Sequence, residues 1–317
     1  MPPRSPLPQR LGLDAAWLRT NDGDRSAPPV WTTMREWLHY RLPENVEVDA
    51  FLDTGRFVYA NGEAVHGEDR YRSNTFIWFH RDLPVETPVP GRIRVIHRDE
   101  RIVVIDKPPF LSSIPRGRHV RESVVVRMRE ELGLPELSPM HRLDRVTSGV
   151  LMLATEQRWR APYQTMFMRG EVQKVYRALA GIREDLVLPT VVRNHLIKER
   201  GIMNAEIVPG AEPNSESLVE LESEIAPGPD GTRRGIYRLS PRTGKTHQLR
   251  MHLWSLGIPI AGDPLYPVAQ DVAVDDFSTP LQLLAHTLSF SDPIDGTERR
   301  FESTRPFPLT AESGDSR

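Results

Sequence analysis

One stretch of 14 residues, HRLDRVTSGVLMLA from His141 to Ala154, constrains the fold more than any other part of the sequence. Its last five residues are all apolar and follow the turn-forming Thr147-Ser148-Gly149, which predicts a buried β-strand entered through a tight turn. Asp144 then lies in the loop before that strand, where a rigid scaffold often holds catalytic side chains. By itself, an acid between two arginines is most often a surface ion pair. The role of Asp144 therefore depends on the rest of the chain.

The amino-acid composition excludes several classes of protein. The chain has 317 residues and no cysteine, which excludes disulfide frameworks, thiolate catalysis and cysteine-ligated metal sites. The N-terminus lacks the apolar segment of a secretory signal, and no stretch approaches the roughly 18 apolar residues of a membrane span. We expect a cytoplasmic protein with no membrane contact. Since no exposed heptad is present, we also expect a monomer with no obligate protein partner.

The net charge of −2 hides a segregation of charge along the chain. Residues 91–130 contain ten basic and five acidic side chains, whereas residues 184–230 contain ten acids and three basic residues. Phosphate contacts require Lys and Arg, so the basic segment before Asp144 is a candidate surface for nucleic acid. A solvated charged face is the alternative interpretation.

The sequence divides into four segments. Residues 1–29 are rich in Pro, Arg and Ser without any period, and we expect an unfolded arm. Residues 30–90 contain a helical pattern and an Asn61-Gly62 turn, which predict a small α+β unit that ends in a proline-containing linker. Residues 91–310 are long enough for the main domain. Residues 311–317 form a short tail.

Apolar patterns in the main domain predict strands and helices in a fixed order. The expected elements are a strand within 99–109, a helix over 120–133, a strand over 150–154, a helix over 159–168, strands over 172–181 and 283–290, and loops with an edge hairpin over 184–235.

A further helix is expected over residues 243–257, TGKTHQLRMHLWSLG, with Thr246 as its N-cap. Its buried stripe would consist of Leu249, Leu253 and Leu256. His247, Arg250 and Trp254 would then share another face. The stretch completes neither a P-loop nor a zinc protease motif.

Three ordered motifs together resemble the signature of the RluA-type RNA pseudouridine synthase family: HRLDxxTSG at 141–149, KxYxA at 174–178 and GKTHQLRxH at 244–252. The resemblance covers about residues 95–305. It implies an α+β fold with a large mixed, mostly antiparallel sheet and flanking helices. It also implies an isomerase that needs no cofactor or metal and acts on ribosomal or transfer RNA.

The resemblance implies roles for individual residues. Asp144 would be the catalytic carboxylate, Tyr176 would stack on the flipped base, and Arg250 would pair with Asp144. Lys245 stands where the family commonly has Arg, so bidentate phosphate contact would be lost there. Further substrate contacts are assigned to His141, Arg142, Lys174, His247 and Lys107.

Some alternatives stay open at this level. Residues 55–62, after a helix, resemble a degenerate alpha-L RNA-binding module, and a plain packing appendage is an equal alternative. A non-catalytic RNA-binding or ribosome-assembly factor on the same fold is a second functional class, and a nucleoside hydrolase acting through Asp144 is a third. For the isomerase, attack at C1′, attack at C6 and a glycal route all need one carboxylate.

Overall fold

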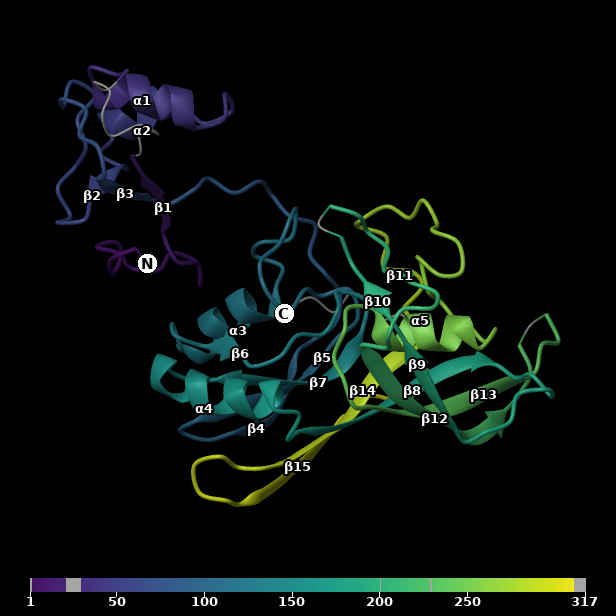
Figure 1. Cartoon of the computed structure of the whole chain (residues 1–317). Helices are drawn as coiled ribbons and strands as arrows, with labels where there is room; N and C mark the ends of the chain where they lie inside the picture. Colours follow the sequence, from purple (N-terminus) through teal and green to yellow (C-terminus); the bar gives the residue numbers. More distant parts are fainter. Residues whose placement is uncertain (1, 21–29, 200, 229, 311–317) are drawn as a thin grey trace. The chain divides into compact units, whose positions relative to one another are not determined.

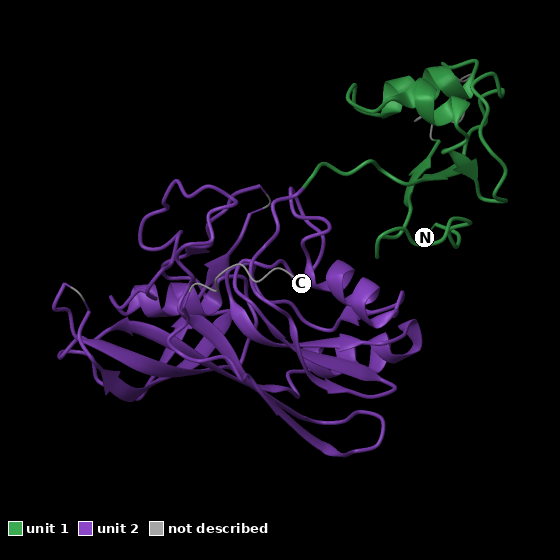
Figure 2. Ribbon diagram, turned by 180° about the vertical axis from the view of Figure 1, so that it is seen from behind, with its two compact units in different colours: residues 1–85 green, residues 86–317 purple. Residues whose placement is uncertain are grey.

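A computed structural model of the chain has two compact units, residues 1–85 and 86–317 (Figure 2). The structure describes residues 2–20, 30–199, 201–228 and 230–310. The tail expected at 311–317 and the end of the expected arm, residues 21–29, lie outside the described residues. The division falls at Val85, where the proline-containing linker begins.

The small unit is a helix pair on a three-stranded antiparallel sheet with strand order β1-β3-β2. The expected unfolded arm is wrong for residues 16–19, which form β1 and pair with β3 along its whole length. Leu18 and Ala16 face the apolar core of this unit, and their burial explains why the segment folds. The elements are β1 (Ala16–Arg19), α1 (Met34–Arg41), α2 (Val48–Asp53), β2 (Val58–Tyr59) and β3 (Phe76–Phe79).

The large unit is built on a ten-stranded sheet (Figure 1). Eight strands follow the order β4-β5-β7-β14-β8-β13-β12-β9, with β15 on β14 and β6 on β7. Among the described strands of this sheet, β7 and β14 alone pair in parallel, which confirms the expected mixed, mostly antiparallel sheet. Its strands are β4 (Arg94–Arg98), β5 (Ile102–Lys107), β6 (Ser138–Pro139), β7 (Ser148–Ala154), β8 (Gln173–Gly181), β9 (Thr190–Asn194), β12 (Ser215–Ile225), β13 (Arg234–Pro241), β14 (Leu283–Ser291) and β15 (Glu298–Glu302); β10 (Leu196–Ile197) and β11 (Glu206–Ile207) form a separate ribbon.

Helices cover both faces of this sheet. Helices α3 (Val124–Leu132) and α5 (Gln248–Ser255) pack on one face, and α4 (Gln157–Met168) packs on the other. Alternate residues of β5 serve the two cores, because successive side chains of a strand point to opposite faces: Ile105 faces α3, and Val104 faces the α4 side. Within the described residues, no helix combines the length and apolar character that crossing a membrane requires.

Residues 184–235 contain more strand than the expected loops and edge hairpin, because β12 alone has 11 residues. Several acidic side chains there pair with arginines of other strands of the sheet. Glu222 pairs with Arg177 of β8, and Glu216 pairs with Arg193 of β9. Some of the acidic residues that suggested loops therefore form ion pairs on the surface of the sheet.

Gly149, at the start of β7, packs closely against the backbone of the neighbouring strand β14. It pairs with Ala285 of β14, and Ala285 pairs in turn with Tyr176 of β8. A Cβ on Gly149 would lie 2.2 Å from the carbonyl oxygen of Ala285, and the glycine has φ +110°. One row across three strands thus connects the loop that carries Asp144 to Tyr176.

Replacing Gly149 with Ala is expected to lower the free energy of unfolding by about 3 kcal/mol, because the new methyl group meets backbone and the φ angle is strained. Gly133→Ala is the matched control: its φ is also positive, at +65°, but nothing lies within 4 Å of the new Cβ. It should cost only about 1 kcal/mol. Urea unfolding followed by fluorescence measures both, and equal losses would contradict the close packing of β7 on β14.

Candidate active site

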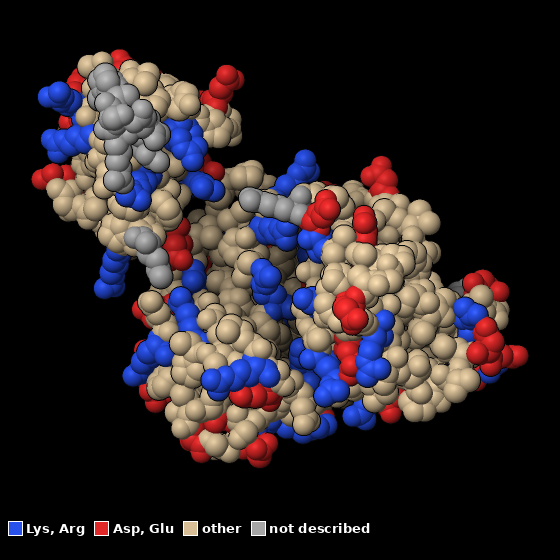
Figure 3. Space-filling model, in the orientation of Figure 1, with Lys and Arg blue, Asp and Glu red and all other residues tan. Residues whose placement is uncertain are grey.

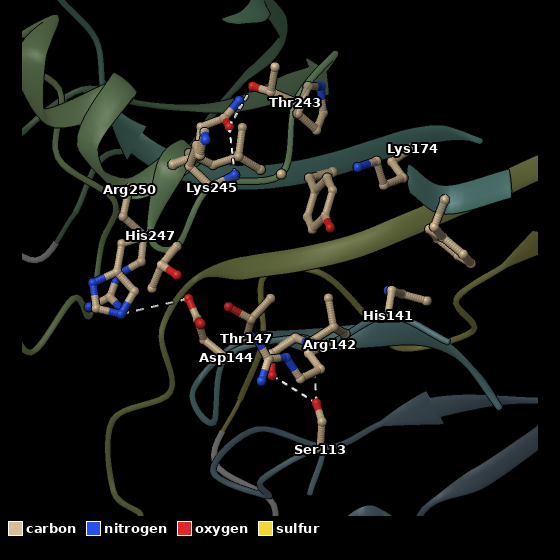
Figure 4. Close-up of a pocket in the computed structure, with 18 of the residues that line it drawn as sticks. Ser113, His141, Arg142, Asp144, Thr147, Lys174, Thr243, Lys245, His247 and Arg250 are labelled. Atoms are coloured by element: carbon tan, nitrogen blue, oxygen red, sulfur yellow. Dashed lines mark hydrogen bonds and ion pairs between the residues drawn. The ribbon is translucent and has the colours of Figure 1, made fainter. Parts of the chain in front are cut away.

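A cavity of about 850 Å³ opens in the large unit beside the start of β7, the start of β8 and the loop before α5 (Figure 4). Among the described residues that line it, Asp144 is the only carboxylate. Figure 3 shows Lys and Arg side chains gathered around a hollow of the large unit. The cationic residues that line the cavity are Arg116, Arg142, Arg145, Arg169, Lys174, Arg242, Lys245 and Arg250. The cavity is therefore suited to a polyanion and carries a single acid.

Asp144 lies in a loop that is fixed by hydrogen bonds on both sides. Its carbonyl accepts a hydrogen bond from the Thr147 N–H at 3.0 Å, which closes the predicted turn. Ser113 Oγ donates to the carbonyl of Leu143 at 2.8 Å and accepts from the Leu143 N–H at 3.1 Å (Figure 4). The Asp144 side chain is 35% exposed and faces the cavity. Ser113 and Thr147 were not assigned from sequence, since neither belongs to a periodic pattern.

Lys107, which was assigned a substrate contact from the sequence, does not line the cavity. Its ammonium group is buried and donates to the carbonyls of Pro108, Leu111 and Arg145 at 3.0, 2.7 and 3.1 Å. Burial, with a smaller contribution from Arg305, lowers its pKa well below the usual value, while Asp144 opposes this shift. Lys107 instead ties the end of β5 to the residue that follows Asp144.

Arg250 lines the same cavity as Asp144, but the expected ion pair between them is not formed. The guanidinium donates to both carboxylate oxygens of Asp263, at 2.7 and 2.5 Å. Both side chains are almost completely buried, and two buried charges gain most by pairing with each other. Asp263 was missed because it lies in a loop after α5, outside any helical or strand pattern.

Among the described residues, His247 is the ion-pair partner of Asp144. Its Nε2 is 3.9 Å from Asp144 Oδ2 (Figure 4). Its Nδ1 is 2.8 Å from the hydroxyl of Tyr266, which accepts a hydrogen bond from the Ala205 N–H at 2.7 Å. Burial lowers the pKa of His247 to about 4, although Asp144 opposes the shift. The imidazole is therefore neutral at pH 7.

The start of α5 differs from the expected helix. The helix begins at Gln248 with His247 as N-cap, in the left-handed region with φ +58°, so Thr246 is not the cap. The expected shared face is confirmed, because His247, Arg250 and Trp254 all contact the ring of Tyr266. The residues before the helix form a loop that lines the cavity and includes Lys245.

Tyr176 and Lys174 lie two residues apart on β8, so their side chains share one face, and both line the cavity. Burial raises the pKa of the Tyr176 hydroxyl, and the charge of Asp144 raises it further, so the phenol is neutral. Burial lowers the pKa of Lys174. The structure thus brings these two residues into one cavity with Asp144.

His141 lines the cavity and also holds β7 in place. Its Nε2 accepts a hydrogen bond from the Met152 N–H at 3.1 Å, and its ring stacks on Phe167 with centroids 4.7 Å apart. Burial, with a contribution from Lys174, lowers its pKa to about 3. The ring is therefore neutral and fixed in orientation.

The basic segment predicted from residues 92–129 contributes little to the lining of the cavity. Of its ten basic residues, all of which the structure describes, only Arg116 lines the cavity. Arg127 pairs with Glu122, and Arg101 pairs with Asp295. The positive charge around Asp144 comes instead from several parts of the chain. One contributor is Arg142, which is exposed and forms no hydrogen bond or ion pair with the residues that the structure describes.

Over the described ranges, no group of three or more His, Cys, Asp or Glu side chains comes together in a way that could hold a metal ion.

The chain is similar to known RNA pseudouridine synthases. The family model for RNA pseudouridylate synthases matches residues 101–255. The dual-specificity RNA pseudouridine synthase RluA of Pasteurella multocida is 32% identical over 217 residues, which cover 65% of this chain and 90% of that protein. The mitochondrial tRNA pseudouridine(32) synthase of Saccharomyces cerevisiae is 33% identical over 272 residues, which cover 80% of this chain and 57% of that protein.

A solved structure shares the fold. Human RNA Pseudouridylate Synthase Domain Containing 1 superimposes with a TM-score of 0.55 at 21% identity, covering 70% of this chain and 87% of that one. With the cavity, its single carboxylate and the sequence relatives, these findings identify the chain as a member of the RluA-type RNA pseudouridine synthase family, and hence as an isomerase that acts on RNA.

Proposed function

We propose that the protein converts a uridine of ribosomal or transfer RNA to pseudouridine, with Asp144 as the catalytic carboxylate. The observation that supports this most is the isolation of Asp144, the one acid among the described lining residues, in a cavity with eight cationic ones. A phosphate-binding surface needs such cations, and a lone acid among them has no evident role in binding RNA. One sequence relative is named as a tRNA pseudouridine synthase, which supports transfer RNA as a substrate class.

The reaction needs only one carboxylate from the protein. The bond from N1 to C1′ breaks, the base turns, a bond from C5 to C1′ forms, and the proton on C5 is lost while N1 gains one. Asp144 would attack C1′ or C6, or would remove the 2′ proton to give a glycal. All three routes require the ionised carboxylate.

The base must leave its stack to reach Asp144, at a cost of a few kcal/mol. Tyr176 supplies an aromatic plane in the cavity as a neutral phenol, and stacking on it offsets part of that cost. Arg142 has its guanidinium free of protein partners in the described structure, and it would fill the vacated position or hold a phosphate.

Arg250 and His247 would act on Asp144 from the other side. We infer that Tyr266 donates its hydroxyl proton to His247 Nδ1, because that contact, at 2.8 Å, is shorter than its 3.4 Å contact to the Ala205 carbonyl. The His247 proton is then on Nε2, which faces Asp144. Arg250 lies in the same wall, and its guanidinium is held in position by Asp263.

Mapping of pseudouridine in total RNA tests the proposal directly. Cells that lack the protein should lose pseudouridine at one or a few positions, and wild type should restore it, whereas Asp144→Ala and Asp144→Asn should not. Asp185→Asn, a surface acid paired with Arg183, is the matched control and should restore the sites. Restoration by Asp144→Ala, or no change at any site, would reject catalysis by Asp144.

Arg250→Lys separates a role in catalysis from a role in folding. Lys cannot make the two parallel bonds to Asp263, so we expect a loss of about 3 kcal/mol in unfolding free energy and at least a roughly 100-fold lower rate on the mapped RNA. Arg299→Lys is the control, since Arg299 pairs with buried Asp292 at 3.1 Å but does not line the cavity. It should lose stability and keep its rate. Equal rates for both folded variants would leave Arg250 a purely structural residue.

The pKa of about 4 for His247 predicts a pH dependence of stability. In the unfolded chain a histidine binds its proton near pH 6.5, so between pH 6.5 and 4 the unfolded state holds more protons than the folded state. Stability should therefore fall as the pH falls through this window, by up to about 1.4 kcal/mol per pH unit for this group. His247→Gln should flatten that slope, and His195→Gln, at a half-exposed position, should not. The unfolding free energies of wild type and His247→Gln are measured in urea at pH 7, 6 and 5. The same change with pH in both proteins would contradict the assignment.

A further inference from the structure

The cavity extends well beyond Asp144. Its volume of about 850 Å³ lies in the upper part of the range for small-molecule sites, roughly 300–1,000 Å³. Asp144, His247 and Arg250 occupy one end, while His141 and Lys174 lie at the other (Figure 4). A single flipped uridine at Asp144 would leave the second end without an occupant.

Lys174 is a half-buried cation that lacks a counter-charge. It forms no hydrogen bond or ion pair with any described residue, and its Nζ would be 3.8 Å from a Cβ built on Gly244 in the opposite wall. The buried Lys107 shows the contrast, because its ammonium is satisfied by three carbonyls. Removing part of the water from a cation without pairing it is unfavourable, so the position favours an anionic ligand.

His141 presents a neutral donor beside this cation. Its Nε2 accepts from a backbone N–H, so the single proton of the neutral ring is on Nδ1. Nδ1 has no hydrogen-bond partner among the described residues. It is also not among the unpaired polar atoms of those residues that are buried from solvent. The stack on Phe167 fixes the ring plane. A charged donor and a neutral donor therefore line the same end of the cavity, and the lining contains no acid there to oppose an anion.

We propose that the His141–Lys174 end of the cavity binds the phosphate group of a nucleotide adjacent to the flipped uridine. The register rests on the proposed function, in which the uridine base lies at Asp144 and Tyr176. Lys174 is two residues from Tyr176 on β8, which separates them by roughly 6.6 Å along the strand. This distance is comparable with the span of one nucleotide, so a neighbouring phosphate reaches Lys174 when the base contacts Tyr176.

Binding of a single-uridine RNA with one neutral linkage tests this subsite. The probe is the fluorescent nonanucleotide CCCCUCCCC, made with normal linkages or with a methylphosphonate on the 5′ or the 3′ side of the uridine. Affinities are measured over a range of salt for wild type, Lys174→Gln, Lys174→Arg and Asp144→Ala. Arg158→Gln removes one positive charge from a surface arginine that does not line the cavity, and it serves as the control.

One of the two neutral linkages should weaken wild-type binding by about tenfold, the loss expected for one hydrogen bond to a charged group. Lys174→Gln should weaken binding of normal RNA by a similar factor, lower the salt slope by about 0.7, and show no further loss with that linkage. Lys174→Arg should recover most of the affinity. Arg158→Gln and Asp144→Ala should keep the wild-type response to the linkage.

Two results would overturn the subsite. One is that wild-type protein has the same affinity for the normal probe and for both methylphosphonate probes, or does not bind the normal probe at all. The other is additive losses for Lys174→Gln and the neutral linkage, which would mean that the two groups do not meet. The proposed function fails separately, by unchanged RNA maps, because the binding measurement needs no catalysis.

Discussion

The arrangement of the site depends on the parallel pairing of β7 with β14 at Gly149. A glycine is needed there because a Cβ would enter the backbone of Ala285. The same row of the sheet continues to Tyr176 on β8, so one register fixes the distance between the strand that follows Asp144 and the strand that carries the aromatic residue. A shift of one residue in β8 would turn Tyr176 and Lys174 to the opposite face of the sheet. Backbone packing thus positions groups that are far apart in the sequence.

Electrostatics adds to this framework. The whole chain has a net charge of −2, yet the cavity brings one carboxylate together with eight cations drawn from five or more separate segments. Several acids that balance the total lie on β12, where Glu216, Glu222 and Glu224 pair with arginines. Charge is therefore segregated by the fold more than by the sequence. Local field, and not net charge, governs attraction of RNA to such a cavity.

The sequence predicted features that local patterns encode, and it failed where distant segments meet. Five apolar residues after a turn were enough to place β7, and the three motifs were enough to place Asp144, Tyr176 and His247 in one cavity. Lys107 was assigned a substrate contact from the resemblance, and nothing in Lys-Pro-Pro reveals that its side chain is buried and bonded to the carbonyl of Arg145. The predicted pairing of Arg250 with Asp144 was wrong for a similar reason. Asp263 reaches it from a loop 13 residues away, and no periodicity connects a loop to a helix face.

His247 shows how the site overrides local preference. A helix N-cap normally has extended backbone and a side chain such as Ser, Thr, Asp or Asn, and Thr246 satisfies the second condition one residue earlier. The structure instead places His247 at the cap with φ +58°, a conformation uncommon outside glycine. Contacts with Tyr266 offset that strain and direct the imidazole toward Asp144. Strain held by surrounding packing is characteristic of functional positions, so the start of α5 is determined by the site and not by helix capping.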